Sequence, residues 1–345
     1  MEEARVSMAS EPGKVRIINR AEESSNPVSP DIPRNLIMAL IIGVLLGLII
    51  NIFIEYFDNS IRSLEYIERK KLPILAIIPS IRETKLPKEK YGFFIKKKEK
   101  KSVIINSRKT VGNLQRRMIT HEDPKSPISE AYRSLRTSLM YTKQGNQGSM
   151  MVSSPGPGEG KTTTIINLAI TYANLGKKTI LIDGDLRKPV IHKVFNGNND
   201  IGLTHYLSGL EKNLGSIINS TDVNNLDIIY NGAIPPNPSE LLGSELMKRM
   251  VKESRERYDI VLFDAPPIMA VTDAVVLSRL LDQFVFVVRF GSTDKNSIDH
   301  ALTALNNVGT SLTGVVFNDL NQNNSYYSKS YYSYNQYYYS TEQTG

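Results

Sequence analysis

Cysteine and tryptophan are both absent from the 345-residue sequence. Without cysteine, the chain has no disulfide framework, no thiolate-ligated zinc site, no iron–sulfur cluster and no thiol nucleophile. A chain of this length can form one large domain or two small ones with a sizeable core. The protein must therefore fold by burying apolar surface and perform its chemistry with other side chains.

The net charge of +7 and the pI of about 9.2 are typical of nucleic-acid-binding proteins. The excess, however, is confined to residues 55–117, which contain 17 Lys/Arg against 7 Asp/Glu. That segment is net +10, which leaves −3 for the rest of the chain. A basic folded domain is not indicated, and we expect no nucleic-acid partner.

Charged residues are also absent from Asn35–Ile54, an apolar run between Arg34 and Glu55. As a helix the run spans about 30 Å, the thickness of a bilayer core. A buried core helix is the alternative, and a signal peptide is disfavoured because 34 residues precede the run. Lys and Arg gather on the cytoplasmic side of membrane helices, so the basic block after the run predicts an N-terminus outside and a C-terminus inside. We expect the same block to contact anionic membrane lipids.

Composition divides the chain into five segments. Residues 1–34 are expected to be an extracytoplasmic remnant, 35–54 a transmembrane helix, 55–120 a basic juxtamembrane linker, 121–320 a regular domain and 321–345 a tyrosine-rich tail. In the regular domain, apolar β-branched runs alternate with helical patterns, which indicates an α/β fold with a doubly wound parallel sheet. Strands are predicted at 149–153, 179–183, 226–230, 260–264, 283–288 and 312–318, with a short one at 72–79; helices are predicted at 128–141, 161–175, 239–257, 273–280 and 296–308.

A glycine-rich loop, SSPGPGEGKTTT, joins the strand at 149–153 to the helix at 161–175. In this context the amides of such a loop converge on phosphate oxygens, with Lys161 on the β/γ-phosphates and the Thr162 hydroxyl on Mg²⁺. Pro155 stands where the strict pattern has glycine. A Gly/Pro turn followed by a chance Lys-Thr is the alternative interpretation.

Carboxylates follow two further predicted strands. ILIDGDLRKP contains Asp183, Asp185 and Arg187, and DIVLFDAPP ends its strand at Asp264. Because ligands bind at the carboxyl ends of parallel strands, these side chains should share one crevice with Lys161. Three carboxylates beside a triphosphate imply Mg²⁺ between them. Taken singly, each Asp could be an ordinary strand-end turn.

These three motifs resemble the Walker A, Walker A′ and Walker B motifs of the bacterial protein-tyrosine kinases, the Wzc-like autokinases of capsule and exopolysaccharide assembly. The resemblance covers about residues 126–345 and includes the segment NGAIPPNPSELLGSELM. Gly156 replaces the signature lysine of the related MinD/ParA ATPases, and the eukaryotic kinase signatures are absent. Upstream, Pro27, Pro30, Pro33, Gly43 and Gly47 resemble the second transmembrane segment of Wzz-like polysaccharide copolymerases.

The resemblance implies a P-loop NTPase fold of the MinD/ParA type, ATP and Mg²⁺ as cofactors, and a bacterial inner-membrane location. Metal ligands would be Thr162, Asp185 and Asp264; Lys161 would stabilise phosphate charge. Asp183 would accept the tyrosine proton, a role that could be exchanged with Asp185. The implied nucleotide-binding residues are Gly156, Gly158, Glu159, Gly160, Lys161, Thr162, Thr163, Arg187 and Asn318, the last through adenine. Arg187 would also orient the carboxylates.

The resemblance also implies self-association. Glu130, Arg133 and Arg136 match an E-x-x-R-x-x-R motif linked to ring assembly. The tail lacks aliphatic residues and is expected to be disordered; beside a tyrosine-kinase site it becomes the substrate, phosphorylated by a neighbouring subunit. Its tyrosines are Tyr326, Tyr327, Tyr331, Tyr332, Tyr334, Tyr337, Tyr338 and Tyr339. A phosphotyrosine phosphatase and polysaccharide export proteins are the further partners expected.

Two alternatives remain open. The chain could be a membrane-tethered P-loop ATPase switch that phosphorylates nothing, although the tail favours a kinase. It could instead be a copolymerase scaffold that controls glycan length, but the short extracytoplasmic part suggests a fragment of a longer protein.

Overall fold

A computed structural model describes residues 30–80, 118–142 and 148–320. The tail tyrosines and the lysine-rich run 96–101 lie outside the described residues. The chain forms two compact units, Met1–Asp58 and Asn59–Gly345.

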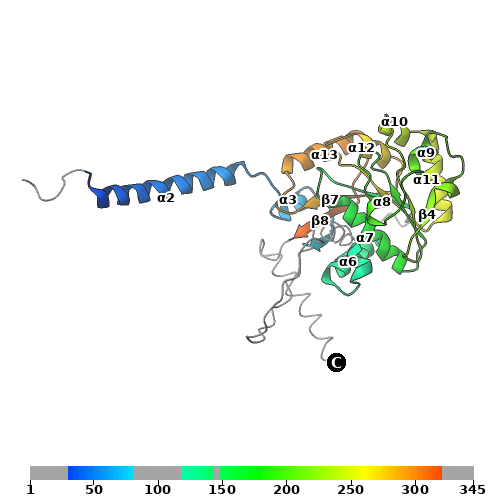
Figure 1. Cartoon of the computed structure of the whole chain (residues 1–345), viewed down its shortest axis with the longest axis horizontal. Coiled ribbons are helices and arrows are strands. Elements are labelled where there is room, and N and C mark those ends of the chain that lie inside the picture. The colour runs from blue at the N-terminus through cyan, green and yellow to red at the C-terminus, as the bar shows by residue number, and fades with distance from the viewer. Residues whose placement is uncertain (1–29, 81–117, 143–147, 321–345) are drawn as a thin grey trace, which may run out of the picture. The chain divides into compact units, whose positions relative to one another are not determined.

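The first unit contains one long helix, α2 (Ile32–Phe57), drawn in blue in Figure 1. Asp31 caps it by accepting a hydrogen bond from the Arg34 amide, and a proline occupies the first turn, where no amide partner is needed. No residue of α2 is buried. The helix is long and apolar enough to span a membrane, and it extends the predicted span by three residues at each end.

The second unit is built on an eight-stranded sheet in the order β1-β8-β7-β2-β6-β3-β5-β4. All neighbours are parallel except β4 and β5, which are antiparallel. The strands are β1 (Ile74–Pro79), β2 (Ser149–Ser153), β3 (Thr179–Asp183), β4 (Ile218–Ser220), β5 (Leu226–Ile229), β6 (Ile260–Asp264), β7 (Gln283–Arg289) and β8 (Gly314–Leu320). Strands β2, β3 and β6 match the predicted bounds, because each is a fully buried apolar run.

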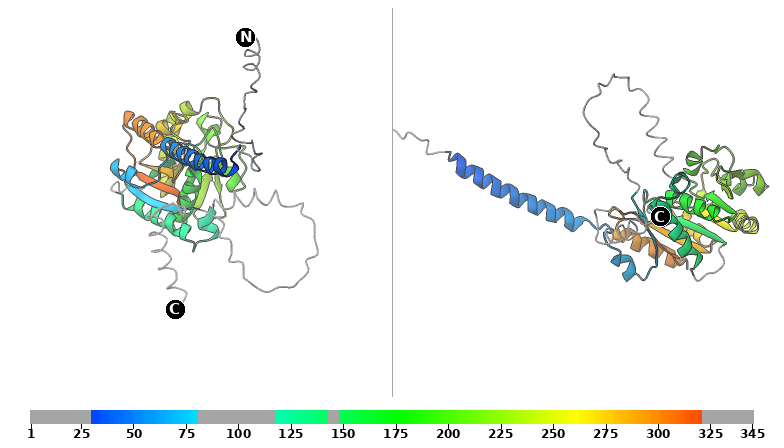
Figure 2. Two further views of the ribbon diagram at one scale, coloured as in Figure 1. Left: turned by 90° about the vertical axis from the view of Figure 1, so that its left-hand side faces the viewer. Right: turned by 90° about the horizontal axis from the view of Figure 1, so that it is seen from below.

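Helices cover both faces of the sheet, as predicted, and each face has its own apolar core. One core includes α6, α7 and α8, and the other α3, α9, α11, α12 and α13. Figures 1 and 2 show α6 and α13 on opposite sides of the strands. The helices are α3 (Glu65–Arg69), α5 (Ile119–Glu122), α6 (Pro127–Met140), α7 (Lys161–Asn174), α8 (Ile191–Val194), α9 (Leu203–Leu207), α10 (Pro238–Leu242), α11 (Glu245–Arg257), α12 (Asp273–Ser278) and α13 (Lys295–Asn307), with a 3₁₀ turn, η2 (Leu214–Ile217).

The single helix predicted at 239–257 is in fact two helices. Helix α10 ends at Gly243, and Ser244 begins α11 by accepting a hydrogen bond from the Met247 amide at 3.2 Å. The Ser244 side chain takes the place of the backbone carbonyl that would accept from the Met247 amide in a continuous helix, so a new helix begins here.

The segment expected to be a juxtamembrane linker, 55–120, contains ordered structure, because residues 59–80 belong to the folded unit that begins at Asn59. Strand β1 pairs with β8, which confirms the short strand predicted there. Helix α3 is anchored on α13, where the Tyr66 hydroxyl donates to Asp299 Oδ1 at 2.7 Å. Residues 59–80 are thus an integral part of the domain that the sequence placed at 121–320.

Candidate active site

Three strand ends that the sequence singles out are neighbours in the sheet, where β2, β6 and β3 lie side by side. Asp183 and Asp264 are register partners at the ends of β3 and β6. Between the strand ends, the Gly184 amide donates to the Asp264 carbonyl at 2.9 Å, and a Cβ at Gly184 would lie 2.7 Å from that oxygen. Glycine is required here because the backbones approach so closely.

The glycine-rich loop leads from β2 directly into α7, which begins at Lys161. Gly158 and Gly160 have φ angles of 79° and 97°, left-handed values that favour glycine. Each gives the loop a turn that brings its amides toward the N-terminus of α7, where the helix dipole favours an anion.

The lysine of such a loop binds phosphate oxygens, and Lys161 here lies among carboxylates. Lys161 Nζ is 3.0 Å from Asp185 Oδ2 and 3.7 Å from Asp264 Oδ1. The Thr162 hydroxyl donates to Asp264 Oδ2 at 2.7 Å. The structure therefore brings together four of the side chains predicted to form the site.

Burial sets the protonation of this cluster. It raises the pKa of Asp183 well above its usual range, with a further increase from the charge of Asp264. Burial also raises the pKa of Asp264, partly offset by Lys161 and Thr162. For Lys161, burial lowers the pKa, but the charges of Asp264 and Asp185 outweigh it, so the net pKa is raised. The lysine stays charged where phosphate oxygens would approach.

The oxygens of the cluster suit a divalent cation. Asp183 Oδ1 and Asp264 Oδ1 are buried and accept no hydrogen bond. However, within the described ranges no set of three or more His, Cys, Asp or Glu side chains is placed to hold a metal. The ligand set predicted from the sequence, Thr162, Asp185 and Asp264, contains two carboxylates and a hydroxyl, and it stays a prediction. Mg²⁺ commonly binds through one or two carboxylates together with phosphate and water, and the Thr162 hydroxyl beside Asp264 fits that pattern.

The hydrogen bonds of Arg187 go to Asp273 and not to Asp183, Asp185 or Asp264, the carboxylates that it was expected to orient. Its guanidinium donates to both oxygens of Asp273, at 2.8 and 3.1 Å, and Asp273 also accepts from the Ser239 hydroxyl. The arginine thus ties the loop after β3 to α12 and α10. Asp273 and Ser239 were missed by the sequence analysis, although Ser239 lies in the segment noted for its resemblance.

Asn231 is a third residue to which the sequence assigned no role, although it opens the segment NGAIPPNPSELLGSELM. It follows β5, is fully buried, and donates from Nδ2 to the Asp185 carbonyl at 3.2 Å. The Asp185 side chain also accepts from the Lys188 amide at 3.1 Å. These bonds fix the loop that presents Asp185 to Lys161.

Asn318, expected near adenine, lies across the glycine-rich loop. Its Nδ2 donates to the Glu159 carbonyl at 2.9 Å, and a Cβ at Gly160 would come within 2.0 Å of that nitrogen. Glu159 itself turns inward, where its Oε1 accepts from the Gly156 amide at 3.3 Å. The Thr163 carbonyl accepts from Asn167 inside α7. Through its hydrogen bond to the Glu159 carbonyl, Asn318 fixes the glycine-rich loop against β8.

The predicted ring motif lies on α6, and its three residues make two different kinds of contact. Glu130 and Arg133 form an ion pair one helical turn apart on the exposed surface. Arg136 instead donates to the Thr171 carbonyl of α7 at 2.8 Å. Glu130 and Arg133 are thus accessible to a neighbour, whereas Arg136 joins α6 to the helix that follows the loop.

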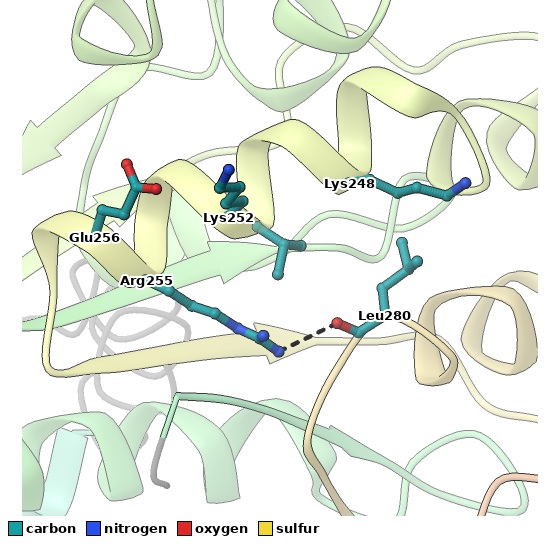
Figure 3. A pocket seen from close by; sticks show the side chains of 6 residues that line it. Lys248, Lys252, Arg255, Glu256 and Leu280 are labelled. Atoms are coloured by element: carbon teal, nitrogen blue, oxygen red, sulfur yellow. Dashed lines mark hydrogen bonds between the residues drawn. The ribbon is translucent and has the colours of Figure 1, made fainter.

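A surface pocket of about 260 Å³ lies away from this site, along α11 (Figure 3). It is lined by Lys248, Val251, Lys252, Arg255, Glu256 and Leu280. Arg255 also contacts Ser149, the first residue of β2, which places the pocket at the opposite end of the strands from Lys161. The carboxylate cluster, and not this pocket, is the candidate active site, because Lys161, Asp185 and Asp264 gather there.

Comparison with known proteins identifies the family. The chain is 42% identical over 207 residues to the tyrosine-protein kinase YwqD of Bacillus subtilis, covering 59% of this chain and 86% of YwqD. The chain belongs to the bacterial tyrosine-protein kinases. It is 35% identical over 213 residues to the putative kinase CapB of Staphylococcus aureus, covering 61% of this chain and 93% of CapB.

The tyrosine-kinase relationship extends to solved structures and to longer relatives. The kinase domain of Escherichia coli ETK aligns with a TM-score of 0.64 at 28% identity, covering 77% of this chain and 97% of that domain. Residues 150–309 match the family model of an AAA domain. The chain also matches the putative kinase AmsA of Erwinia amylovora, 31% identical over 92% of this chain, but spans only 42% of AmsA. As a family member, the protein is a tyrosine kinase with a P-loop α/β fold.

Proposed function

We propose that this tyrosine kinase is a membrane-anchored autokinase that transfers the γ-phosphate of ATP to tail tyrosines of a neighbouring subunit, and thereby regulates exopolysaccharide or capsule synthesis and export. The observation that carries the proposal is the convergence of Lys161, Thr162, Asp185 and Asp264 beside a phosphate-binding loop. Phosphoryl transfer depends mainly on positioning and on charge stabilisation, and this cluster supplies both.

In the proposed reaction, Lys161 and the loop amides bind the β- and γ-phosphates and stabilise the charge that develops there. Thr162, Asp264 and Asp185 would hold Mg²⁺, which when bound neutralises phosphate charge. The tyrosine oxygen forms a bond to the γ-phosphorus while the bond to the β–γ bridging oxygen breaks, so that ADP leaves.

Asp183 is our candidate for the group that accepts the phenolic proton. Its buried position raises its pKa, and a stronger base captures a proton more effectively. Asp185 is the alternative base, because it lies 3.0 Å from Lys161 and is also nearly buried. Comparing the phosphorylation rates of Asp183→Asn and Asp185→Asn across pH separates the two roles: only the base variant loses the pH dependence.

The proposed membrane arrangement places α2 across the bacterial inner membrane, with the N-terminus outside and the kinase domain in the cytoplasm. The support is the apolar length of α2 and the basic segment that follows it. Anionic lipids would contact that segment. A protease-protection assay on membrane vesicles tests this: protection of the kinase domain in right-side-out vesicles is expected.

Subunits are proposed to assemble in a ring in which Glu130 and Arg133 contact a neighbour. Each phosphotyrosine adds about −1.5 to −2 charges, so multiple phosphorylation of the tail would loosen the ring by repulsion. A phosphotyrosine phosphatase would reverse the step, and export proteins would respond to the assembly. Sedimentation before and after incubation with ATP and Mg²⁺ tests this; an unchanged particle mass would count against disassembly.

Mass spectrometry of the tail after incubation with ATP and Mg²⁺ tests the kinase activity itself. We expect phosphate on several of the eight tail tyrosines in the wild type and none in Lys161→Met. Phosphotyrosine formed by purified Lys161→Met alone would contradict the proposal. ATP hydrolysis without any phosphotyrosine would favour the ATPase-switch alternative.

A further inference from the structure

The glycine-rich loop is hydrogen-bonded to the turn after β7, a segment that contains no recognised motif. The Thr293 hydroxyl donates to Glu159 Oε1 at 2.9 Å and accepts from the Arg289 amide at 2.8 Å. Thr293 and Glu159 are both buried, with 2% and 6% of their surface exposed. The hydroxyl is thus a fixed link between the turn after β7 and the glycine-rich loop.

Glu159 connects Thr293 to the backbone of the glycine-rich loop. The oxygen that accepts from Thr293 also accepts from the Gly156 amide at 3.3 Å, so one carboxyl oxygen joins two segments. The Glu159 carbonyl accepts from Asn318. Loop, β8 and the turn after β7 therefore meet at Glu159.

The same turn is bonded to the segment that begins the folded unit. The Ile61 amide donates to the Thr293 carbonyl at 2.9 Å, and the Gly291 amide donates to the Ile61 carbonyl at 2.7 Å. Ser60 and Asp294 form an antiparallel bridge, and Ile61 is fully buried. Thr293 is thus bonded on both sides, through its backbone to residues 59–61 and through its hydroxyl to Glu159.

We propose that Thr293 is a positioning residue for the nucleotide, which with Glu159 braces the phosphate-binding loop against the turn after β7 and residues 59–61. A loop that must present several amides to phosphate binds best when its shape is set in advance. The brace also turns the Glu159 carboxyl group away from the phosphate side of the loop and into a buried site. The inference rests on the proposed use of ATP by this loop.

Thr293→Val tests the brace because it removes the hydroxyl and keeps the size of the side chain. We expect the Kd and KM for MgATP to rise about tenfold, which is the factor that corresponds to the loss of one hydrogen bond of about 1.4 kcal/mol. The change in kcat should be smaller. Thr293→Ser keeps the hydroxyl and should restore the affinity. Binding of a fluorescent ATP analogue to the full chain measures the Kd without requiring any phosphorylation, so failure of the kinase proposal would not obscure the result.

Thr313 offers a matched control. Its hydroxyl also accepts a hydrogen bond from a backbone amide, that of Phe284, at 3.0 Å. Thr313 lies directly before β8, and its hydrogen bonds go to Phe284 and not to Glu159. Thr313→Val should lower stability by a similar amount and leave the MgATP Kd unchanged. Equal effects of the two valine variants on the Kd would overturn the proposal, since the role of Thr293 would then be structural only.

A double-mutant cycle covers the case in which Thr293→Val folds poorly. Glu159→Leu removes the acceptor of the same hydrogen bond, and Thr293→Ala removes its donor without adding bulk. The double variant should bind MgATP no more weakly than Glu159→Leu alone. If Thr293→Ala weakens binding equally with Glu159 or Leu at position 159, the two residues do not act as one brace.

Discussion

Asp183 and Asp264 face each other in register at the ends of β3 and β6, and both side chains are essentially fully buried. Burial is the main cause that raises both pKa values; the charge of Asp264 raises the pKa of Asp183 further, and that of Asp185 raises the pKa of Asp264. The fold therefore maintains an arrangement that is unfavourable for stability and suited to binding cations and protons.

Replacing Asp183 by Asn should separate stability from activity. The amide oxygen can still accept from the Ile191 amide, which now donates to Asp183 at 3.2 Å, while the repulsion with Asp264 disappears. We expect the urea midpoint of the nucleotide-free protein to be unchanged or higher, and the phosphorylation rate to fall about 100-fold or more. A variant that phosphorylates within tenfold of wild type would show that Asp183 is not the proton acceptor.

Glu159 should make stability depend on pH. Burial raises the pKa of Glu159 from 4.5 to about 8, so the folded protein retains a proton that the unfolded chain has released. Stability must then decrease as the pH rises from 4.5 to about 8, by at most about 1.4 kcal/mol per pH unit from this group. Glu159→Gln removes this contribution, so its melting temperature relative to wild type should rise between pH 5 and pH 8. A difference in melting temperature that stays constant over this range would contradict the assignment.

Arg187 should matter for stability more than for nucleotide binding. Its side chain is 42% exposed, but its partner Asp273 is fully buried. Arg187→Ala leaves that buried carboxylate with fewer hydrogen bonds, and we expect a loss of about 1–3 kcal/mol in the free energy of unfolding. Ser239→Ala, which removes the other donor, should cost about 1 kcal/mol. A raised KM for ATP with unchanged stability would instead support a direct role in nucleotide binding.

Gly184 should not tolerate alanine. A Cβ there would lie 2.7 Å from the Asp264 carbonyl oxygen, so the end of β3 would have to move away from β6. We expect a loss of about 1–3 kcal/mol in unfolding free energy and a reduced phosphorylation rate. Gly215→Ala is the control, since its Cβ would meet only the Asn213 side chain, at 3.2 Å. Wild-type kinetics and stability in Gly184→Ala would show that the strand ends can adjust.

The central strands and the phosphate loop could be predicted from sequence because their side chains carry the information. Strands β2, β3 and β6 are buried apolar runs that end at Ser153, Asp183 and Asp264, so pattern and chemistry coincide. The neighbouring positions of these strands followed from the requirement that the three motifs share one crevice, and the sheet order confirms it.

The rest depended on contacts that leave little trace in a sequence. The pairing of Ser60 and Ile61 with the turn after β7 uses backbone groups, which any residue supplies. Arg187 stands two residues from Asp185, yet its partner Asp273 comes 86 residues later, and only the packing of α12 decides between them. The break between α10 and α11 occurs inside a continuous helical pattern, so Ser244 was not recognised as a cap.

The position of β1 has a consequence for how the chain is made. Ile74 pairs with Val315, so the first strand of the sheet must wait for the last one to be synthesised. At about 5–20 residues per second, translation of the intervening chain takes roughly 10 to 50 seconds. Until β8 is made, β7 remains the edge of the sheet and β1 has no strand to pair with. Completion of the fold is therefore a late, end-of-synthesis event, and a ribosome that stops before β8 would release a chain in which β1 cannot join the sheet.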